Sequence, residues 1–200
     1  MKKHLRFLAV IAAALGFSGA AWAADIVING STTVLPFAQV AVERFMTANP
    51  EVKISISGGG SGNGFKALID KTASIANASR AIKESEIEQA KTNGVEPFET
   101  GVALDCIVPV VHPTNPVKEL SREQLKKIYT GEVSNWKEIG GDNKPIVVVG
   151  RDSSSGTYGT WQEMVVEKGD KDKKSRVTPK AQVVASSGAM ITTVANNKYA

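Results

Sequence analysis

Cysteine and histidine are nearly absent from this chain of 200 residues, which contains one cysteine and two histidines. A single cysteine cannot form an intramolecular disulfide, so the fold must be stabilised by its core alone. Cys106 lies in the apolar run "VALDCIVPVV", which predicts a buried strand and an inert thiol. His4 precedes the folded part, which leaves only His112, and no His/Cys cluster indicates a metal site. We therefore expect neither a metal nor a cofactor.

Long apolar runs are also missing, and no run after residue 23 is long enough for a membrane span. Residues 1–23, "MKKHLRFLAVIAAALGFSGAAWA", combine early cations, a short apolar run and the small-x-small pattern Ala21-Trp22-Ala23. This order is typical of a signal peptide. A membrane anchor is the alternative, but glycine and serine interrupt the apolar run. We predict cleavage after about Ala23 and a mature protein outside the cytoplasm.

An excess of charge is the third missing feature. The formal net charge is +4, but three of the positive charges, Lys2, Lys3 and Arg6, lie in the predicted leader, which leaves +1 on the mature chain. With 42% hydrophobic and 22% charged residues, the composition is that of an ordinary globular protein. The charge gives little support to nucleic-acid or membrane binding.

Short β-like runs alternate with helical patterns, which is typical of α/β architecture. The expected strands are 25–30, 52–57, 74–79, 102–117, 147–149 and 181–186. The expected helices are 36–49, one from about 65, 83–94, one opening at 121 with a capping box, one from 157, and 188–197. The charged stretch 167–180 is expected to be a solvated loop. The sequence stops at "NNKYA", within the last expected element, so we expect a fragment.

Three of the strand-to-helix turns are rich in glycine and hydroxyl groups: "NGSTTVLP" (29–36), "GGGSGNG" (58–64) and "RDSSSGT" (151–157). Helix caps and loops explain each turn taken alone. In an α/β sheet, however, such turns lie together at the carboxyl ends of the strands. Helix N-termini, hydroxyls and one guanidinium then form a site for a small anion.

Two enzyme classes compete with this interpretation. A Walker A loop needs lysine directly after its second glycine, but Lys66 comes one place late. The run "GNGFKA" (62–67) matches a G-x-G-x-x-A turn with Glu84 or Glu86 at a loosely suitable distance, so a secreted nucleotide-binding enzyme remains the alternative. A serine hydrolase is disfavoured because no serine has the G-x-S-x-G elbow and no histidine is placed as its base.

The set "GSTTVLP", "GGGSGNGFKAL", "ANASRAIKESE", "NWKEIGG" and "RDSSSGT" resembles the periplasmic phosphate-binding protein of bacterial phosphate ABC transporters. The resemblance runs from about Ile26 to the last residue. It implies a type II periplasmic binding protein: an α/β fold of two lobes with mixed sheets flanked by helices, closing on one phosphate without catalysis. The implied partners are inorganic phosphate and the membrane permease subunits, and the receptor is expected to be a monomer.

The resemblance also implies domain boundaries. Residues 24–103 would form the first lobe, and residues 104–200 the hinge crossing and second lobe. Family members continue for several more elements that return to the first lobe, so we expect a C-terminally truncated chain with an incomplete first lobe. Sulfate, molybdate or tungstate remain alternatives to phosphate, because they are tetrahedral oxyanions too.

The phosphate ligands that the resemblance implies come from all three turns. They are Thr32, Thr33, Ser61, Arg151, Ser155, Gly156 and Thr157, with Ser79 as an additional candidate. Some family members have a carboxylate, which accepts a phosphate proton and repels sulfate, where this chain has Arg80. We nominate Asp105 as the acceptor and Asp152 as the second choice, although Asp152 is expected mainly to orient Arg151.

Overall fold

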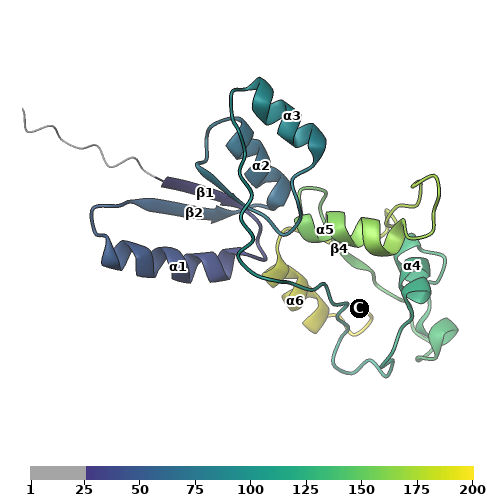
Figure 1. Ribbon diagram of the computed structural model, residues 1–200. Coiled ribbons are helices and arrows are strands. Elements are labelled where there is room, and N and C mark those ends of the chain that lie inside the picture. Colours follow the sequence, from purple (N-terminus) through teal and green to yellow (C-terminus); the bar gives the residue numbers. More distant parts are fainter. Residues whose placement is uncertain (1–25) are drawn as a thin grey trace, which may run out of the picture.

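The computed structural model describes residues 26–200 (Figure 1), so the predicted signal peptide, residues 1–23, lies outside the described residues. The strands are β1 (Ile26–Gly30), β2 (Ile54–Gly58), β3 (Ile75–Asn77), β4 (Val149–Arg151) and β5 (Gln182–Val184). The α-helices are α1 (Leu35–Ala48), α2 (Ser61–Ile69), α3 (Glu84–Thr92), α4 (Arg122–Thr130), α5 (Gly156–Trp161) and α6 (Ser187–Ala195). A 3-10 helix, η1 (Trp136–Ile139), and a π-helical turn, η2 (Gln162–Val166), complete the set.

The N-terminal unit, β1 to α3, is built on a parallel sheet in the order β2-β1-β3. Helix α1 packs against β2, and α2 packs against β1 and β3. Figure 1 shows α1 on one side of this sheet and α2 and α3 on the other. Pro36 lies in the first turn of α1, where its missing N–H costs nothing. Val42 is the buried residue of this helix, whereas Phe37 and Phe45 are exposed.

The C-terminal unit, α4 to α6, contains the parallel pair β4 and β5, in which Arg151 lies opposite Val184. Helices α5 and α6 contact β4, and α4 contacts η2. Val149, Val194 and Ala200 form a small buried cluster beneath this pair. Helix α6 ends at Ala195, so the last five residues follow the helix rather than continue it. All strand pairs in the described residues are parallel, and the isolated bridge between Asn135 and Pro145 is antiparallel.

The connection between the two units corrects one sequence prediction. Residues 102–117 form no strand, and Leu104 and Cys106 are exposed rather than buried. An apolar run forms a strand only where a neighbouring strand pairs with its backbone. Within the described residues, this segment makes one backbone hydrogen bond to a distant part of the chain: the His112 N–H donates to the Ala200 carbonyl at 3.0 Å. The predicted boundary at residues 103 and 104 falls within this irregular segment and stays a prediction.

The starts of two helices can also be compared with the sequence prediction. Helix α2 begins at Ser61, about four residues earlier than expected, because Gly60 at φ +101° turns the chain directly into the helix. The capping box at Ser121 is confirmed: its hydroxyl accepts from Gln124 N–H at 3.1 Å. Helix α4 then ends at Thr130, and Gly131 in the left-handed region stops it.

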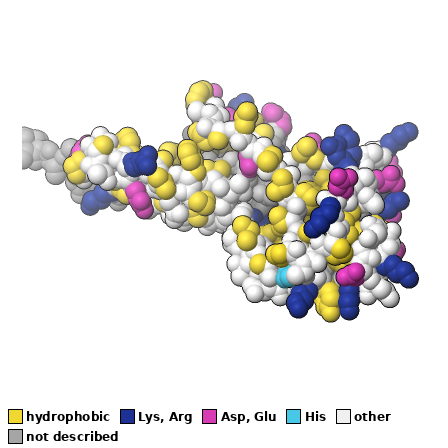
Figure 2. Space-filling view, turned by 90° about the horizontal axis from the view of Figure 1, so that it is seen from below, with side chains coloured by type: hydrophobic (Ala, Val, Ile, Leu, Met, Phe, Trp, Pro, Cys, Tyr) yellow, Lys and Arg dark blue, Asp and Glu magenta, His cyan; other side chains and the backbone are white. Residues whose placement is uncertain are grey.

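On the face that Figure 2 shows, most of the charged side chains lie over the C-terminal unit. The exposed ion pairs Lys127–Glu123 and Lys174–Asp172 belong to this unit. Residues 167–180 form an irregular, largely exposed loop, as predicted. Within residues 26–200, no helix has the length and apolar character to cross a membrane.

Candidate anion-binding site

Hydroxyl groups from separate turns meet between the two units. Thr33, just before α1, lies with its Oγ1 3.2 Å from Thr157 Oγ1 in the first turn of α5. The same Thr33 oxygen lies 3.4 Å from Ser187 Oγ at the start of α6. Ser31, which is buried, holds the Thr33 turn because its Oγ accepts from Thr33 N–H at 3.1 Å. The first turn of the sequence and the last two helices therefore share one polar cluster.

Arg151, the last residue of β4, places a cation in this cluster and is only 6% exposed. Its Nε donates to the Val184 carbonyl and its Nη2 to the Ala185 carbonyl, both at 3.1 Å. These bonds fix the plane of the guanidinium at the carboxyl end of β5. The remaining contacts reach hydroxyls: Nη2 donates to Thr32 Oγ1 at 3.2 Å, and Nη1 to Ser187 Oγ at 3.4 Å.

The positive charge of Arg151 has no counter-ion among the described residues 26–200, where no carboxylate oxygen lies within 4.0 Å of its nitrogens. Burial lowers the pKa of Arg151, and the charge of Asp152 partly opposes this shift. A buried cation without a carboxylate is costly, and a bound anion removes that cost. The electrostatics of the cluster therefore favour an anion.

A second pair of hydroxyls, one from the glycine-rich turn and one from the connection between β3 and α3, lies in the same region. Ser61, the first residue of α2, is fully buried, and its Oγ accepts from Ser79 N–H at 3.0 Å. Ser79 Oγ lies 3.3 Å from the same oxygen. A Cβ on Gly156 would overlap Ser61 Oγ and lie 2.6 Å from Ser79 Oγ. Only glycine lets the first residue of α5 approach both serines this closely.

Ser155 is the N-cap of α5 and is buried. Its Oγ accepts from Tyr158 N–H at 3.2 Å, which satisfies one of the free donors of the helix terminus. This bond directs the start of α5, with Gly156 and Thr157, toward the cluster. The predicted residues of all three turns therefore lie in one region.

Asp105 is the predicted site residue that the structure does not bring to the cluster. It lies in the exposed irregular segment, and its carboxylate accepts from Cys106 N–H at 2.8 Å. The prediction depended on a crossing strand that does not form among the described residues.

Asp152 has a different partner from the one expected. Its Oδ1 accepts from Ser154 N–H at 2.9 Å and also from the Ser154 hydroxyl, so it orients Ser154 rather than Arg151. Burial tends to raise the pKa of Asp152, but the bonds from Ser154 and the nearby Arg151 charge outweigh it and lower the pKa.

Arg80 is neutralised within the N-terminal unit. Its guanidinium donates to both oxygens of Glu86, at 2.8 and 2.7 Å, and lies 4.7 Å above the Phe65 ring. Burial opposes ionisation of Glu86, but the bonds from Arg80 and from Lys83 N–H hold its pKa below the usual value. Arg80 therefore supports the turn that carries Ser79 and brings no free charge to the cluster.

Sequence reasoning missed Ser187. The signal was present, because "VASSGAM" places two serines between an expected strand and an expected helix, as in the three recognised turns. Ser186 caps α6 by accepting from Ala189 N–H at 3.1 Å. Ser187 contributes a hydroxyl, and its N–H donates to Thr32 Oγ1 at 3.4 Å. The cluster thus receives the three recognised turns, the turn before α6, and Ser79 from the connection between β3 and α3.

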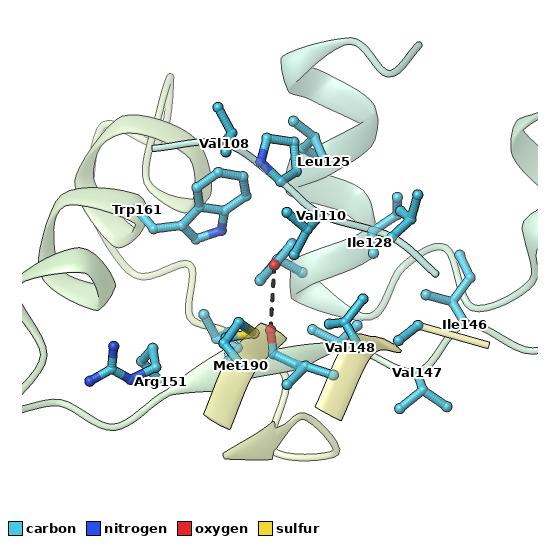
Figure 3. A pocket seen from close by; sticks show the side chains of 18 of the residues that line it. Val108, Val110, Leu125, Ile128, Ile146, Val147, Val148, Arg151, Trp161 and Met190 are labelled. Carbon is cyan, nitrogen blue, oxygen red and sulfur yellow. Dashed lines mark hydrogen bonds between the residues drawn. The ribbon is translucent and has the colours of Figure 1, made fainter. Parts of the chain in front are cut away.

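An apolar cavity of about 150 Å³ borders Arg151 (Figure 3). Val108, Leu125 and Met190 are among its lining residues, and the Trp161 indole faces it. Tyr129 donates its hydroxyl to the Val149 carbonyl at 3.5 Å, and burial raises the pKa of Tyr129 to about 12. Arg151 and Thr157 border the cavity, but most of its lining is apolar, so the polar cluster, where hydroxyls from several turns meet, is the better anion site.

The chain has two α/β units with parallel strands, and their strand-to-helix turns meet around a buried arginine. This arrangement is that of the class of two-lobed binding proteins. The chain belongs to the family described as the PBP superfamily domain, whose model matches residues 17–200. It is similar to the phosphate-binding protein PstS of Bacillus subtilis, with 34% identity over 72% of this chain and 46% of that protein. The PstS of Staphylococcus saprophyticus is 36% identical over 71% of this chain and 46% of its own length. The chain thus spans about half the length of these relatives.

Solved structures show the same fold. A substrate-binding protein from Clostridium perfringens, solved with bound phosphate, is 37% identical and superposes with a TM-score of 0.71. The match covers 88% of this chain and 68% of that one. An ABC-type phosphate transport receptor from Vibrio cholerae is 33% identical, with a TM-score of 0.58 over 87% of this chain and 68% of its own.

Proposed function

We propose that the chain binds one inorganic phosphate ion between its two units and delivers it to an ABC transporter. The observation that carries this proposal is the buried guanidinium of Arg151, which faces hydroxyl groups and no carboxylate among the described residues. The names of the relatives, several of which are phosphate-binding proteins, support the choice of phosphate over other oxyanions.

The proposed ligands are the residues predicted from the sequence that meet in the cluster, with Ser187 added: Thr32, Thr33, Ser61, Ser79, Arg151, Ser155, Gly156, Thr157 and Ser187. On binding, phosphate oxygens replace the bonds that these hydroxyls now make with one another, such as the 3.2 Å contact of Thr33 with Thr157. The N-termini of α2, α5 and α6 add N–H donors. Because one anion contacts both units, its binding stabilises the closed arrangement of the units.

Hydroxyls also accept hydrogen bonds, so the threonines can accept a hydrogen bond from the P–OH group of hydrogen phosphate. This matters because Asp105 lies outside the cluster. Sulfate discrimination then depends on how strongly these hydroxyls prefer a protonated oxygen. The Asp105→Asn variant tests the original nomination, because its phosphate and sulfate affinities should match those of the unaltered chain.

The competing enzyme is disfavoured by the packing of the glycine-rich turn. Gly62 N–H donates to the Ser154 carbonyl at 2.8 Å, so the turn is covered by the third loop where a nucleotide would need space. A receptor breaks no bond and needs no catalytic base. We propose that the mature chain works in the periplasm after cleavage near Ala23, as a monomer that docks on membrane permease subunits.

Isothermal titration with phosphate, sulfate, molybdate and tungstate tests the proposal. Truncating one partner of a buried charge-assisted contact costs about 2–5 kcal/mol, so Arg151→Ala should weaken phosphate binding by about 30-fold to several thousand-fold. Arg176→Ala is the matched control, because Arg176 is exposed and paired with Glu167 in the outer loop. Equal affinities for Arg151→Ala and the unaltered chain would reject the site. Adenosine nucleotide binding without phosphate binding would favour the enzyme.

A further inference from the structure

The third loop contacts the glycine-rich turn directly, next to the proposed anion ligands but without using any of their side chains. Ser154 makes this contact with two groups. Its carbonyl accepts from Gly62 N–H at 2.8 Å, and its Oγ lies 3.0 Å from the Gly59 carbonyl, to which it donates. In each of these two bonds the donor and the acceptor belong to different units, so the bonds join the N-terminal and C-terminal units.

Asp152 fixes the Ser154 side chain in this position. Its Oδ1 accepts from the Ser154 N–H and shares the single hydroxyl proton with the Gly59 carbonyl. The side chain therefore cannot rotate toward solvent without losing bonds to a partly buried carboxylate. The Asp152 carboxylate acts on the contact only through Ser154.

The glycines of the second turn make the contact sterically possible. A Cβ on Gly60 would lie 2.7 Å from both the carbonyl and the hydroxyl oxygen of Ser154. A Cβ on Gly62 would lie 3.2 Å from the same carbonyl, which is tighter than ordinary van der Waals contact. The turn thus offers bare backbone to Ser154, and larger residues would push the two units apart.

We propose that Ser154, oriented by Asp152, is a positioning residue that joins the two units and keeps the closed arrangement populated before an anion enters. This inference rests on the proposed function for its purpose, although the contact itself needs no anion. A receptor whose competent state is already populated loses less affinity to the conformational equilibrium. Weakening the contact should therefore lower both the closed population and the apparent phosphate affinity.

Two variants weaken the contact in different ways. Ser154→Ala removes the hydroxyl bond to Gly59, and one hydrogen bond of this kind corresponds to about a 2- to 12-fold change in an equilibrium. Gly62→Ala crowds the Ser154 carbonyl but favours helix α2, because alanine is a better helix former than glycine. We therefore expect at least one of the two variants to keep the fold. Ser153→Ala is the matched control, because Ser153 is exposed in the same loop.

Distances between two spin labels report the arrangement of the units without any ligand. Glu51→Cys and Lys180→Cys, in a Cys106→Ser background, place labels before β2 and β5, at the ends of the strands away from the site. We expect the anion-free distance distributions of Ser154→Ala and Gly62→Ala to shift to longer values, and that of Ser153→Ala to remain unchanged. Titration should show about 2- to 12-fold weaker phosphate binding for both variants.

The readouts separate the two ideas. Longer anion-free distances in the variants support the contact even if no chain binds phosphate, in which case only the proposed function fails. Distance distributions identical to those of the Ser153→Ala control overturn the inference, whatever the phosphate affinity.

Discussion

Arg151 owes its role to the shape of its side chain as well as to its charge. One edge of the guanidinium is used by the Val184 and Ala185 carbonyls, and the rest is left for Thr32 and Ser187. A lysine ammonium has three donors and no planar fork, so two bonds to carbonyls would leave it a single donor for a ligand. Arg151, at the end of β4, is therefore a buried cation with a fixed orientation.

Ser187 should contribute directly to anion affinity. Ser187→Ala removes a hydroxyl that lies between Arg151 and Thr33, so we expect phosphate binding to weaken by about 3- to 30-fold, the range of one or two hydrogen bonds. Thr192→Ala, on the exposed face of the same helix, is the control and should bind normally. Titration calorimetry measures both. Unchanged affinity for Ser187→Ala would remove α6 from the site.

At the scale of elements, the site depends on helix starts that come very close together. Gly156 opens α5 against Ser61 at the opening of α2, and Ser155 caps the helix behind it. A local signal, hydroxyls before a helical pattern, predicted the start of α5, but the start of α2 was expected about four residues too late because Gly60 turns the chain directly into that helix. The pairing of particular hydroxyls depends on how two units face each other, which no local pattern encodes.

Gly156→Ala should abolish binding. The new Cβ would overlap the Ser61 hydroxyl and lie 2.6 Å from that of Ser79, so α5 must move away, at a cost of about 1–3 kcal/mol of stability. Gly150→Ala is the control, because a Cβ there meets nothing within 4 Å. Phosphate titration and chemical denaturation of both variants check this. Normal binding by Gly156→Ala would show that the two helix starts are farther apart than described.

The Arg80–Glu86 pair should make stability depend on acid pH. The folded-state pKa of Glu86 is below its ordinary value of 4.5, so its contribution is fully present above about pH 4.5 and is lost as the pH falls through the lower, folded-state pKa. Glu86→Gln should therefore lower the free energy of unfolding by about 1–3 kcal/mol at pH 7, and by less at pH 3.

Denaturant unfolding at both pH values measures the effect of Glu86→Gln. Glu84→Gln is the control, because Glu84 is exposed in the same turn of α3. A difference between Glu86→Gln and the unaltered chain that stays constant down to pH 3 would contradict the assigned ion pair.

For the whole molecule, the alternation of strands and helices predicted α/β architecture, and the hydroxyl-rich turns predicted an anion site. The two lobes and the individual ligands came from the family resemblance. The failures concern long-range pairing. The run 102–117 is apolar enough for a strand, yet Leu104 and Cys106 are exposed because the strand partner that pairing requires does not lie beside them. Asp105 lies outside the cluster for the same reason. Ser187 could have been predicted, because it too lies in a hydroxyl-rich turn between an expected strand and an expected helix.

Phosphate should stabilise the chain as a whole, because the proposed ligands come from both units. A ligand at 100 times its dissociation constant adds about 2.7 kcal/mol to the free energy of unfolding. For a chain of 200 residues, this raises the midpoint of thermal unfolding by about 5–10 °C. Differential scanning calorimetry should show one transition that moves upward, because an anion held by Arg151 on one side and Thr33 and Ser61 on the other couples the two units.

Arg151→Ala should show no such upward shift, while Arg176→Ala should shift like the unaltered chain. If phosphate moved only one of two separate transitions, the anion would contact a single unit. The site would then lie within that unit, and the contacts of Thr33 with Thr157 and Ser187 would be a consequence of packing rather than the frame of the binding site.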